Sequence, residues 1–225
     1  MAITDVFFDL DHTLWDFERN SAMAFDAVLS DYCHGIDHEQ FLKFYVPINV
    51  KYWELYRVDA IDQAGLRYGR LKETFDAIEY SVSDQTIGII ADAYIENLPR
   101  HNHLFEGAIE ILDYLEPRYN LHIITNGFHQ IQESKLRNSG IFDYFRTITN
   151  SETAGVKKPN PLIFESAMRI AGTSASASVM IGDCIDADVK GALKCGMDAI
   201  HFCELRNTPP PIKSVGKLTD LKKFL

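Results

Sequence analysis

The chain opens with an apolar stretch that runs directly into two acids, VFFDLDHTL at residues 6–14. Its first three residues are types that form buried strands. Asp9 and Asp11 follow two positions apart, and carboxylates in such a place are costly unless a cation or a reaction requires them. The stretch therefore predicts a buried strand with an acid pair at its carboxyl end, which is where open α/β sheets bind their ligands.

Length and charge limit the function classes. The 225 residues are enough for one large domain, or for a core with a smaller inserted unit. The formal net charge of -10 argues against a general binder of nucleic acids or anionic membranes. It does not exclude a small phosphorylated substrate, because a local Mg²⁺ and one lysine can outweigh the global sign.

The cysteines and the first residues predict a cytoplasmic protein. No C-x-x-C pair or zinc-site spacing occurs among the four cysteines, Cys33, Cys184, Cys195 and Cys203. We therefore expect reduced thiols. Residues 1–5 lack the basic and apolar regions of a signal peptide, and no stretch reaches the ~18 apolar residues of a spanning helix.

Strand and helix signals alternate after about residue 100. Strands are predicted at 121–125, 145–149, 178–181 and 198–202. Helices are predicted at 106–115, 128–138, 161–171 and 187–194. Alternation of this kind is typical of an α/β fold with a doubly wound parallel sheet.

An all-helical insertion is predicted directly after the first strand. Long amphipathic segments occur at 21–32, 39–56, 62–80 and 83–97. We expect Pro47 to break or kink the second segment, and Asp62 and Ser83 to cap the third and fourth. The predicted domains are a core of residues 1–15 and 98–225 and a helical cap of residues 16–97, with residues 215–225 packed back on the core.

Polar groups recur at or near the ends of the predicted strands. They are Asp9 with Asp11, Thr125 with Asn126, Lys158, and Asp183 with Asp188. Because neighbouring strands end at the same edge of a parallel sheet, we expect these groups to lie together although they are far apart in sequence. Carboxylates with one lysine and one threonine suit a Mg²⁺ ion and a phosphate group.

The order and spacing of these groups resemble the haloacid dehalogenase superfamily over essentially the whole chain. The resemblance implies a Rossmann-like core in which Asp9 is the nucleophile that forms an aspartyl-phosphate. It also implies that Asp11 protonates the leaving oxygen and then activates the hydrolytic water. The family's dehalogenases lack an acid at the position of Asp11, so its presence favours the hydrolysis of phosphate esters.

The same resemblance assigns the remaining groups. Thr125 and the backbone N–H of Asn126 would hold phosphate oxygens, and Lys158 would neutralise charge on the transferring group. Asp188 would lie behind them and orient Lys158 or a metal-bound water. The implied ligands of Mg²⁺ are Asp9, the backbone carbonyl of Asp11, and Asp183.

The insertion occupies the position of the family's lid and implies a small phosphorylated metabolite as the partner. Residues 11–17 resemble the pyrimidine 5′-nucleotidase branch, which favours a nucleoside 5′-monophosphate. Sugar-phosphate phosphatases, N-acylneuraminate-9-phosphate phosphatases and phosphomutases remain alternatives. A receiver-like phosphate-sensing module is the alternative outside the enzymes, although receivers are shorter and lack both the lid and an acid placed like Asp11.

Some residues carry two interpretations. Lys157 competes with Lys158, which we prefer because it precedes Pro159, and Asp183 can also be read as a helix N-cap. One aromatic group in the insertion can stack on a base or form the core, and its helical spacing favours the core. Its members are Phe41, Tyr45, Tyr52, Trp53 and Tyr56.

Overall fold

The computed structural model describes residues 2–204 and 208–225. The chain forms two compact units. The first, here called the core unit, comprises Met1–Phe17 and Asn102–Leu225, and the second, the helical unit, comprises Glu18–His101. The boundaries predicted from the sequence lie two to four residues from these.

The core unit is built on one sheet of six strands in the order β3-β2-β1-β4-β5-β6, and every neighbouring pair is parallel. The strands are β1 (Asp5–Phe8), β2 (Asn120–Thr125), β3 (Phe145–Asn150), β4 (Ser178–Gly182), β5 (Asp198–Phe202) and β6 (Lys213–Val215). All four residues of β1 are buried, because the strand lies between two neighbours and is covered on both faces. The predicted doubly wound α/β fold is confirmed.

The register aligns the carboxyl ends of the three central strands. Phe8, the last residue of β1, is level with Ile123 of β2 and Ile181 of β4. β2 therefore continues two residues further, to Thr125, and β4 one residue further, to Gly182. Chain segments that leave these three strands start from one edge of the sheet.

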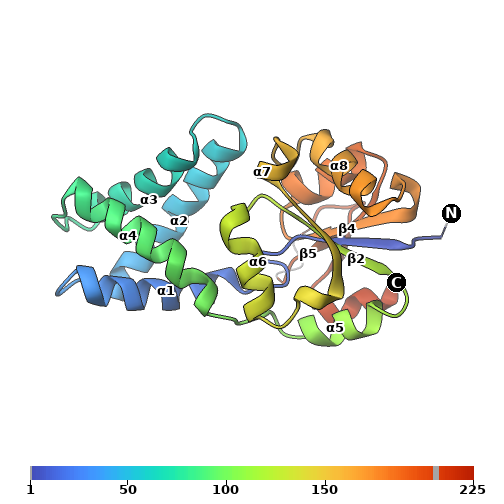
Figure 1. Ribbon diagram of the computed structural model, residues 1–225, viewed down its shortest axis with the longest axis horizontal. Coiled ribbons are helices and arrows are strands. Elements are labelled where there is room, and N and C mark those ends of the chain that lie inside the picture. The colour runs from blue at the N-terminus through green and yellow to red at the C-terminus, as the bar shows by residue number, and fades with distance from the viewer. Residues whose placement is uncertain (1, 205–207) are drawn as a thin grey trace. The chain divides into compact units, whose positions relative to one another are not determined.

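Helices cover both faces of the sheet, and Figure 1 shows α5 and α8 on opposite sides of it. The helices of the core unit are α5 (Ala108–Leu115), α6 (His129–Asn138), α7 (Ser151–Ala154), α8 (Pro161–Ala171) and α9 (Lys190–Lys194). On the face of α8, Ile163 and Phe164 pack with Phe7 and Ile124 in a fully buried cluster. Burial of such apolar side chains is the main stabilising term of the core.

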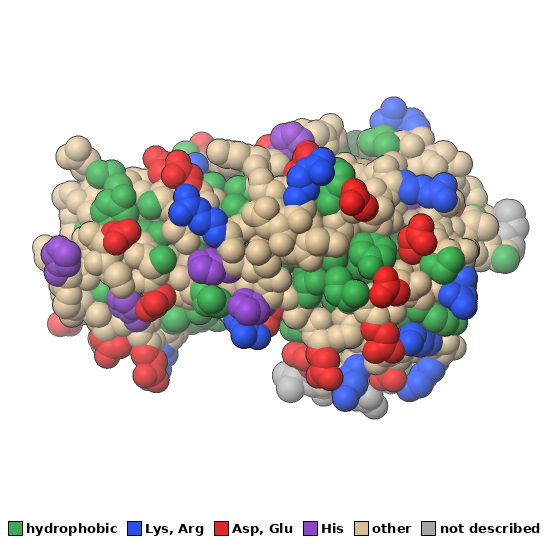
Figure 2. Space-filling view, turned by 60° about the horizontal axis from the view of Figure 1, so that its bottom comes forward, with side chains coloured by type: hydrophobic (Ala, Val, Ile, Leu, Met, Phe, Trp, Pro, Cys, Tyr) green, Lys and Arg blue, Asp and Glu red, His purple; other side chains and the backbone are tan. Residues whose placement is uncertain are grey.

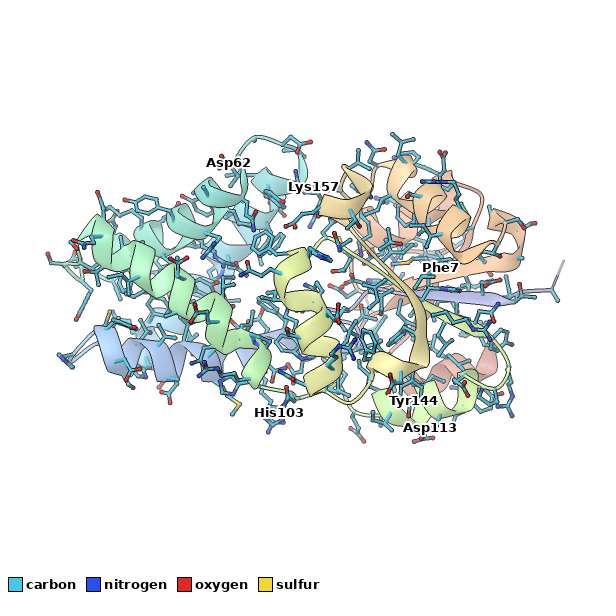
Figure 3. All side chains as sticks on the ribbon, in the orientation of Figure 1. Phe7, Asp62, His103, Asp113, Tyr144 and Lys157 are labelled. Atoms are coloured by element: carbon cyan, nitrogen blue, oxygen red, sulfur yellow. The ribbon has the colours of Figure 1, made fainter. Side chains whose placement is uncertain are left out.

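The helical unit consists of α1 (Phe17–Tyr32, whose first residue belongs to the core unit), α2 (His38–Arg57), α3 (Gln63–Ala77) and α4 (Asp84–Asn97), labelled in Figure 1. The predicted caps are confirmed, since Asp62 (labelled in Figure 3) accepts from Gly65 N–H and Ser83 from Thr86 N–H. The expected break at Pro47 is wrong, because α2 runs through this residue as one helix. A proline removes one hydrogen bond, which the packing of a long amphipathic helix can outweigh.

Two core segments differ from the sequence prediction. The helix expected at 187–194 begins with a π-helical turn, Ile185–Val189, before α9. Residues 213–215 add an edge strand that was not predicted, because three residues give too little pattern. The last residues pack back on the core as expected, through buried Leu218 and Leu221.

The two chain segments that connect the units are paired with each other inside the core unit. Phe105 N–H donates to Leu14 O at 2.9 Å, and Asp16 N–H donates to His103 O at 3.0 Å. Trp15 and Leu104 form an antiparallel bridge between them. The chain therefore leaves the core unit and returns to it through neighbouring backbone segments.

A buried polar network at the amino end of the sheet should make stability depend on pH. His122 Nε2 lies 3.1 Å from Asp5 Oδ1, and His122 Nδ1 lies 2.8 Å from Thr147 Oγ1. Burial lowers the pKa of His122 despite the opposing effect of Asp5. Burial would raise the pKa of Asp5, but hydrogen bonds from its neighbours together lower it.

Both shifts stabilise the folded state above the unfolded pKa values and are lost on acidification. His122 contributes fully above about pH 6.5, and its contribution falls as the pH drops towards its lowered folded pKa. His122→Gln keeps a donor and an acceptor but cannot titrate. We expect the difference in unfolding free energy between wild type and this variant to shrink below pH 6.5 in urea titrations; a difference that is constant with pH would contradict this assignment.

The surface carries mixed charge. On the face in Figure 2, acidic and basic side chains are interspersed, and no broad basic stripe is visible on that face. Over residues 2–204 and 208–225, no helix combines the length and the apolar character needed to cross a membrane.

Candidate active site

Asp9 follows directly on β1 at the centre of the sheet. Its backbone N–H continues the strand pairing by donating to Ile181 O at 2.9 Å, and its side chain is buried. Lys158 Nζ donates to Asp9 Oδ1 at 2.6 Å. The acid pair of the sequence thus begins with a carboxylate that is held by a buried ammonium group.

Lys158 is fixed by its backbone as well as by its side chain. Its Nζ also donates to Ile124 O at 2.8 Å. Asn126 Oδ1 accepts from Lys158 N–H at 2.8 Å, and Asn126 Nδ2 donates to Lys158 O at 3.0 Å. The structure thus places Lys158 against Asp9, whereas Lys157, labelled in Figure 3, precedes it in the loop between α7 and α8. Asn126 therefore ties the lysine loop to the end of β2.

Two further acids join Asp9 at this edge. Carboxylate oxygens of Asp9, Asp183 and Asp188 all lie within 4.8 Å of one another. Asp188 Oδ1 forms an ion pair with Lys158 Nζ at 2.7 Å, while its Oδ2 accepts from Cys184 N–H at 3.0 Å. Asp188 therefore contacts the lysine with one oxygen and the backbone after β4 with the other.

Asp183 lies at the start of the loop after β4. Its Oδ1 accepts from the Thr13 hydroxyl at 3.3 Å, and its backbone carbonyl accepts from His201 Nε2 at 2.7 Å. The N-cap of the following helical turn is Cys184. The alternative interpretation, in which Asp183 is that N-cap, is therefore wrong. Asp183 is instead turned towards the acid cluster.

Burial and mutual repulsion shift the pKa values of this cluster. Burial raises the pKa of Asp9 well above its ordinary value, and the charges of Asp188 and Asp183 add to this against the opposing effect of Lys158. Burial, followed by the charge of Asp188, raises the pKa of Asp183 to about 7. Burial would lower the pKa of Lys158, but Asp188 and Asp9 outweigh it and the net shift is upward.

The donor set fits a hard divalent cation. The cluster holds three carboxylates, and one ammonium group, that of Lys158, contacts two of them, so it carries excess negative charge in a buried place. A bound cation would favour the ionised carboxylates and remove that cost. Among the divalent cations, Mg²⁺ prefers such oxygen ligands and retains waters that a small substrate can share or replace.

Thr125 and Asn126 stand where the sequence analysis placed them, at the end of β2. Thr125 is buried, and its Oγ1 accepts from Gly127 N–H at 3.0 Å. A hydroxyl that accepts from the backbone still has its own hydrogen to donate. The turn therefore presents one hydroxyl donor near the end of the strand that neighbours β1.

Sequence reasoning missed two residues of α6 that hold Asp11. Lys135 Nζ donates to Asp11 Oδ1 at 2.6 Å, and Gln132 Nε2 donates to Asp11 Oδ2 at 3.2 Å. Both side chains are 1% exposed. Their spacing of three residues puts them on one helix face, but polar residues at this spacing usually indicate a solvated face.

The aromatic residues of the insertion differ in their burial. Three of them, Phe41, Tyr45 and Tyr56, are buried in the helical unit, where Phe41 stacks on Tyr45 with ring centroids 5.6 Å apart. Tyr52 and Trp53 are half-buried. The core reading therefore describes the first three.

Gly182 leaves room for Asp188, and a larger residue should disturb the site. A Cβ on Gly182 would lie 2.3 Å from Asp188 Oδ2. We expect Gly182→Ala to displace this carboxylate and lower kcat/KM about 100-fold, because small misplacements of catalytic groups are costly. Gly88→Ala is the matched control, since its Cβ would meet no described atom within 4 Å. Equal activity of the two variants would refute the argument.

Comparison with known proteins gives the family. A family model described as haloacid dehalogenase-like hydrolase matches residues 5–196. The chain is 32% identical over 224 residues to pyrimidine 5′-nucleotidase PynA of Streptococcus pneumoniae, covering 95% of this chain and 91% of the relative. It is 29% identical over 225 residues to pyrimidine 5′-nucleotidase YjjG of Escherichia coli, covering 98% and 96%.

A solved structure agrees with this result. The putative HAD-hydrolase YfnB of Bacillus subtilis superposes with a TM-score of 0.90 at 26% identity and covers 100% of this chain and 99% of that one. The family model covers most of the chain, and the site residues stand at the carboxyl edge of the sheet. The chain therefore belongs to the haloacid dehalogenase-like hydrolases, and it is an enzyme of the phosphatase kind within that family.

Proposed function

We propose that this enzyme hydrolyses small phosphate monoesters through an aspartyl-phosphate and that its substrates are nucleoside 5′-monophosphates. The observation that carries the proposal is the buried contact of 2.6 Å between Lys158 Nζ and Asp9 Oδ1, with Asp11 two residues away. A carboxylate nucleophile beside a fixed cation and a second acid suits phosphoryl transfer, which depends on positioning and charge stabilisation.

In the first step, an Asp9 carboxylate oxygen attacks phosphorus and the ester P–O bond breaks. Asp11, protonated at this stage, gives its proton to the leaving oxygen, so that the product departs as an alcohol. Lys158 and the Thr125 hydroxyl offset the charge on the phosphoryl oxygens. Asp188 keeps the lysine directed at the reacting group through the 2.7 Å ion pair.

In the second step, Asp11 is a carboxylate and takes a proton from water. The oxygen of that water bonds to phosphorus, and the acyl-phosphate P–O bond to Asp9 breaks. The products are inorganic phosphate and the regenerated Asp9 carboxylate, with the proton left on Asp11 for the next cycle. The two acids therefore return to their starting states without any further reactant.

Mg²⁺ is the proposed cofactor. Asp9, the backbone carbonyl of Asp11, and Asp183 would hold it, and when bound it neutralises charge on the phosphoryl oxygens. The excess of carboxylates in the cluster supports this assignment, as does the magnesium named for the YfnB structure.

The choice of nucleotides as substrates rests on the relatives. Two curated relatives over nearly the whole chain are named pyrimidine 5′-nucleotidases. Residues 11–17 carry the acid-aromatic pair, Asp16 and Phe17, that resembles this branch.

The four cysteines are free thiols, which fits a place in the reducing cytoplasm.

A substrate panel tests the proposed function. Phosphate release should be highest with pyrimidine nucleoside 5′-monophosphates and lower with sugar phosphates when Mg²⁺ is present. We expect excess EDTA to abolish release and added Mg²⁺ to restore it. Release greatest from a sugar phosphate would overturn the nucleotide assignment, whereas transfer of phosphate to a second hydroxyl without release would indicate a phosphomutase.

A further inference from the structure

Asp11 is held at both of its carboxylate oxygens by one helix. Lys135 Nζ contacts Oδ1 at 2.6 Å, and Gln132 Nε2 contacts Oδ2 at 3.2 Å. The Asp11 side chain itself is 19% exposed, whereas that of Lys135 is 1% exposed. The side chains that hold it are thus more deeply buried than the carboxylate they hold.

Burying a lysine is costly unless its charge is compensated. Lys135 Nζ lies 4.3 Å from the ring centroid of Trp15 and 5.4 Å from that of Phe17, so two aromatic faces join Asp11 around the ammonium group. Both rings come from the segment that follows Asp11 in the sequence. Cation–π contacts and one ion pair therefore fix the position of Nζ.

The glycine at position 127 leaves space for the side chain of Gln132. A Cβ on Gly127 would lie 1.7 Å from Gln132 Nε2, so the amide occupies the space that any other residue at 127 would fill. Gly127 belongs to the same turn as Thr125, whose hydroxyl accepts from the Gly127 N–H. The turn after β2 and the helix α6 are thus fitted to each other around Asp11.

We infer that Lys135 and Gln132 are positioning residues that fix the carboxyl group of Asp11 in the orientation for proton transfer. The inference rests on the proposed function, in which Asp11 exchanges a proton with the leaving oxygen and with water. An aspartate side chain that rotates freely would spend most of its time misdirected, and misorientation of a catalytic group is costly. Two donors, one on each oxygen, select a single rotamer.

The test uses leaving groups with different needs for a proton. The value of kcat/KM reports steps up to formation of the phosphoenzyme. An alkyl phosphate such as a nucleoside 5′-monophosphate needs an acid in that step, whereas p-nitrophenyl phosphate releases a stable phenolate and does not. We expect Lys135→Met to lower kcat/KM about 100-fold for the alkyl phosphate and less than about threefold for p-nitrophenyl phosphate.

Further variants separate positioning from structural support. Lys135→Arg should retain more activity than Lys135→Met, and Gln132→Met should show the same leaving-group pattern with a smaller loss. Arg137→Met, an exposed residue of the same helix, is the control and should behave as wild type. In an Asp11→Asn background, Lys135→Met should cause no further loss, because the residue acts through Asp11.

The outcomes distinguish this inference from the proposed function. Suppose that Asp11→Asn shows the leaving-group pattern, but Lys135→Met and Gln132→Met lower kcat/KM equally for both substrates. Lys135 and Gln132 are then structural, and this inference fails while the proposed function stands. If Asp11→Asn does not show the leaving-group pattern, Asp11 is not the acid, and the proposed mechanism and the inference that rests on it are both contradicted. Should Lys135→Met not fold, Gln132→Met decides the question by the same comparison.

Discussion

Replacing Asp9 with asparagine is expected to abolish turnover, with kcat lowered at least ~10⁴-fold, because the neutral amide cannot bond to phosphorus. The shape of the side chain is kept, and Lys158 retains its ion pair with Asp188. The fold should therefore survive the change. Phosphate release measures the loss, and mass spectrometry of acid-quenched enzyme should detect a phosphoenzyme in wild type and none in the variant.

A second acid near the same edge provides the control. Asp186 is exposed and pairs with Lys190 at 2.7 Å, and it is not one of the three clustered acids, so Asp186→Asn removes a carboxylate from the same turn as Asp188 and leaves those three in place. We expect near wild-type activity and the same phosphoenzyme. Phosphate found on a residue other than Asp9, or normal turnover in Asp9→Asn, would exclude the aspartyl-phosphate mechanism.

Lys158→Met is expected to cause the largest combined loss of stability and activity. The change leaves Asp9 and Asp188 buried without the ammonium group that contacts both. Removing one partner of a buried ionic group costs ~3–5 kcal/mol, because the remaining charge is uncompensated. Loss of a fixed cation at the transferring phosphoryl group should lower kcat about 10³-fold.

Urea unfolding measures the first effect and phosphate release the second. Lys157→Met changes the neighbouring residue in the same chemical way, and we expect its unfolding free energy to stay within about 0.5 kcal/mol of wild type. Mg²⁺ should recover part of the stability lost in Lys158→Met, since it supplies another positive charge to the cluster. Equal effects of the two lysine variants would contradict the assignment of Lys158.

Apolar strands were the most predictable part of the fold. The strand at residues 198–202 and the helix at 161–171 have the predicted bounds, and Pro161 marks the start of the helix. The break predicted at Pro47 does not occur, since a local rule for proline does not include the packing of a whole helix. The edge strand at 213–215 depends on pairing with β5, which no local pattern reveals.

The site was predictable where chemistry follows a strand end. Asp9 and Asp183 follow two central strands and Thr125 ends a third, so the topology brings them to one edge. Lys135 and Gln132 were not predictable, because their function depends on a contact across more than 100 residues. A buried lysine on an otherwise polar helix looks the same in sequence as a solvated one.

Because residues 14–16 pair with residues 103–105, the coding sequence of the helical unit can be exchanged as one insert. A segment whose two ends are already held together by the host can be exchanged for another of different length at little cost in chain entropy. Every residue assigned to the chemistry lies outside that segment, in the core unit. Selection can therefore replace the part between residues 18 and 101 without rebuilding the machinery that breaks the bond.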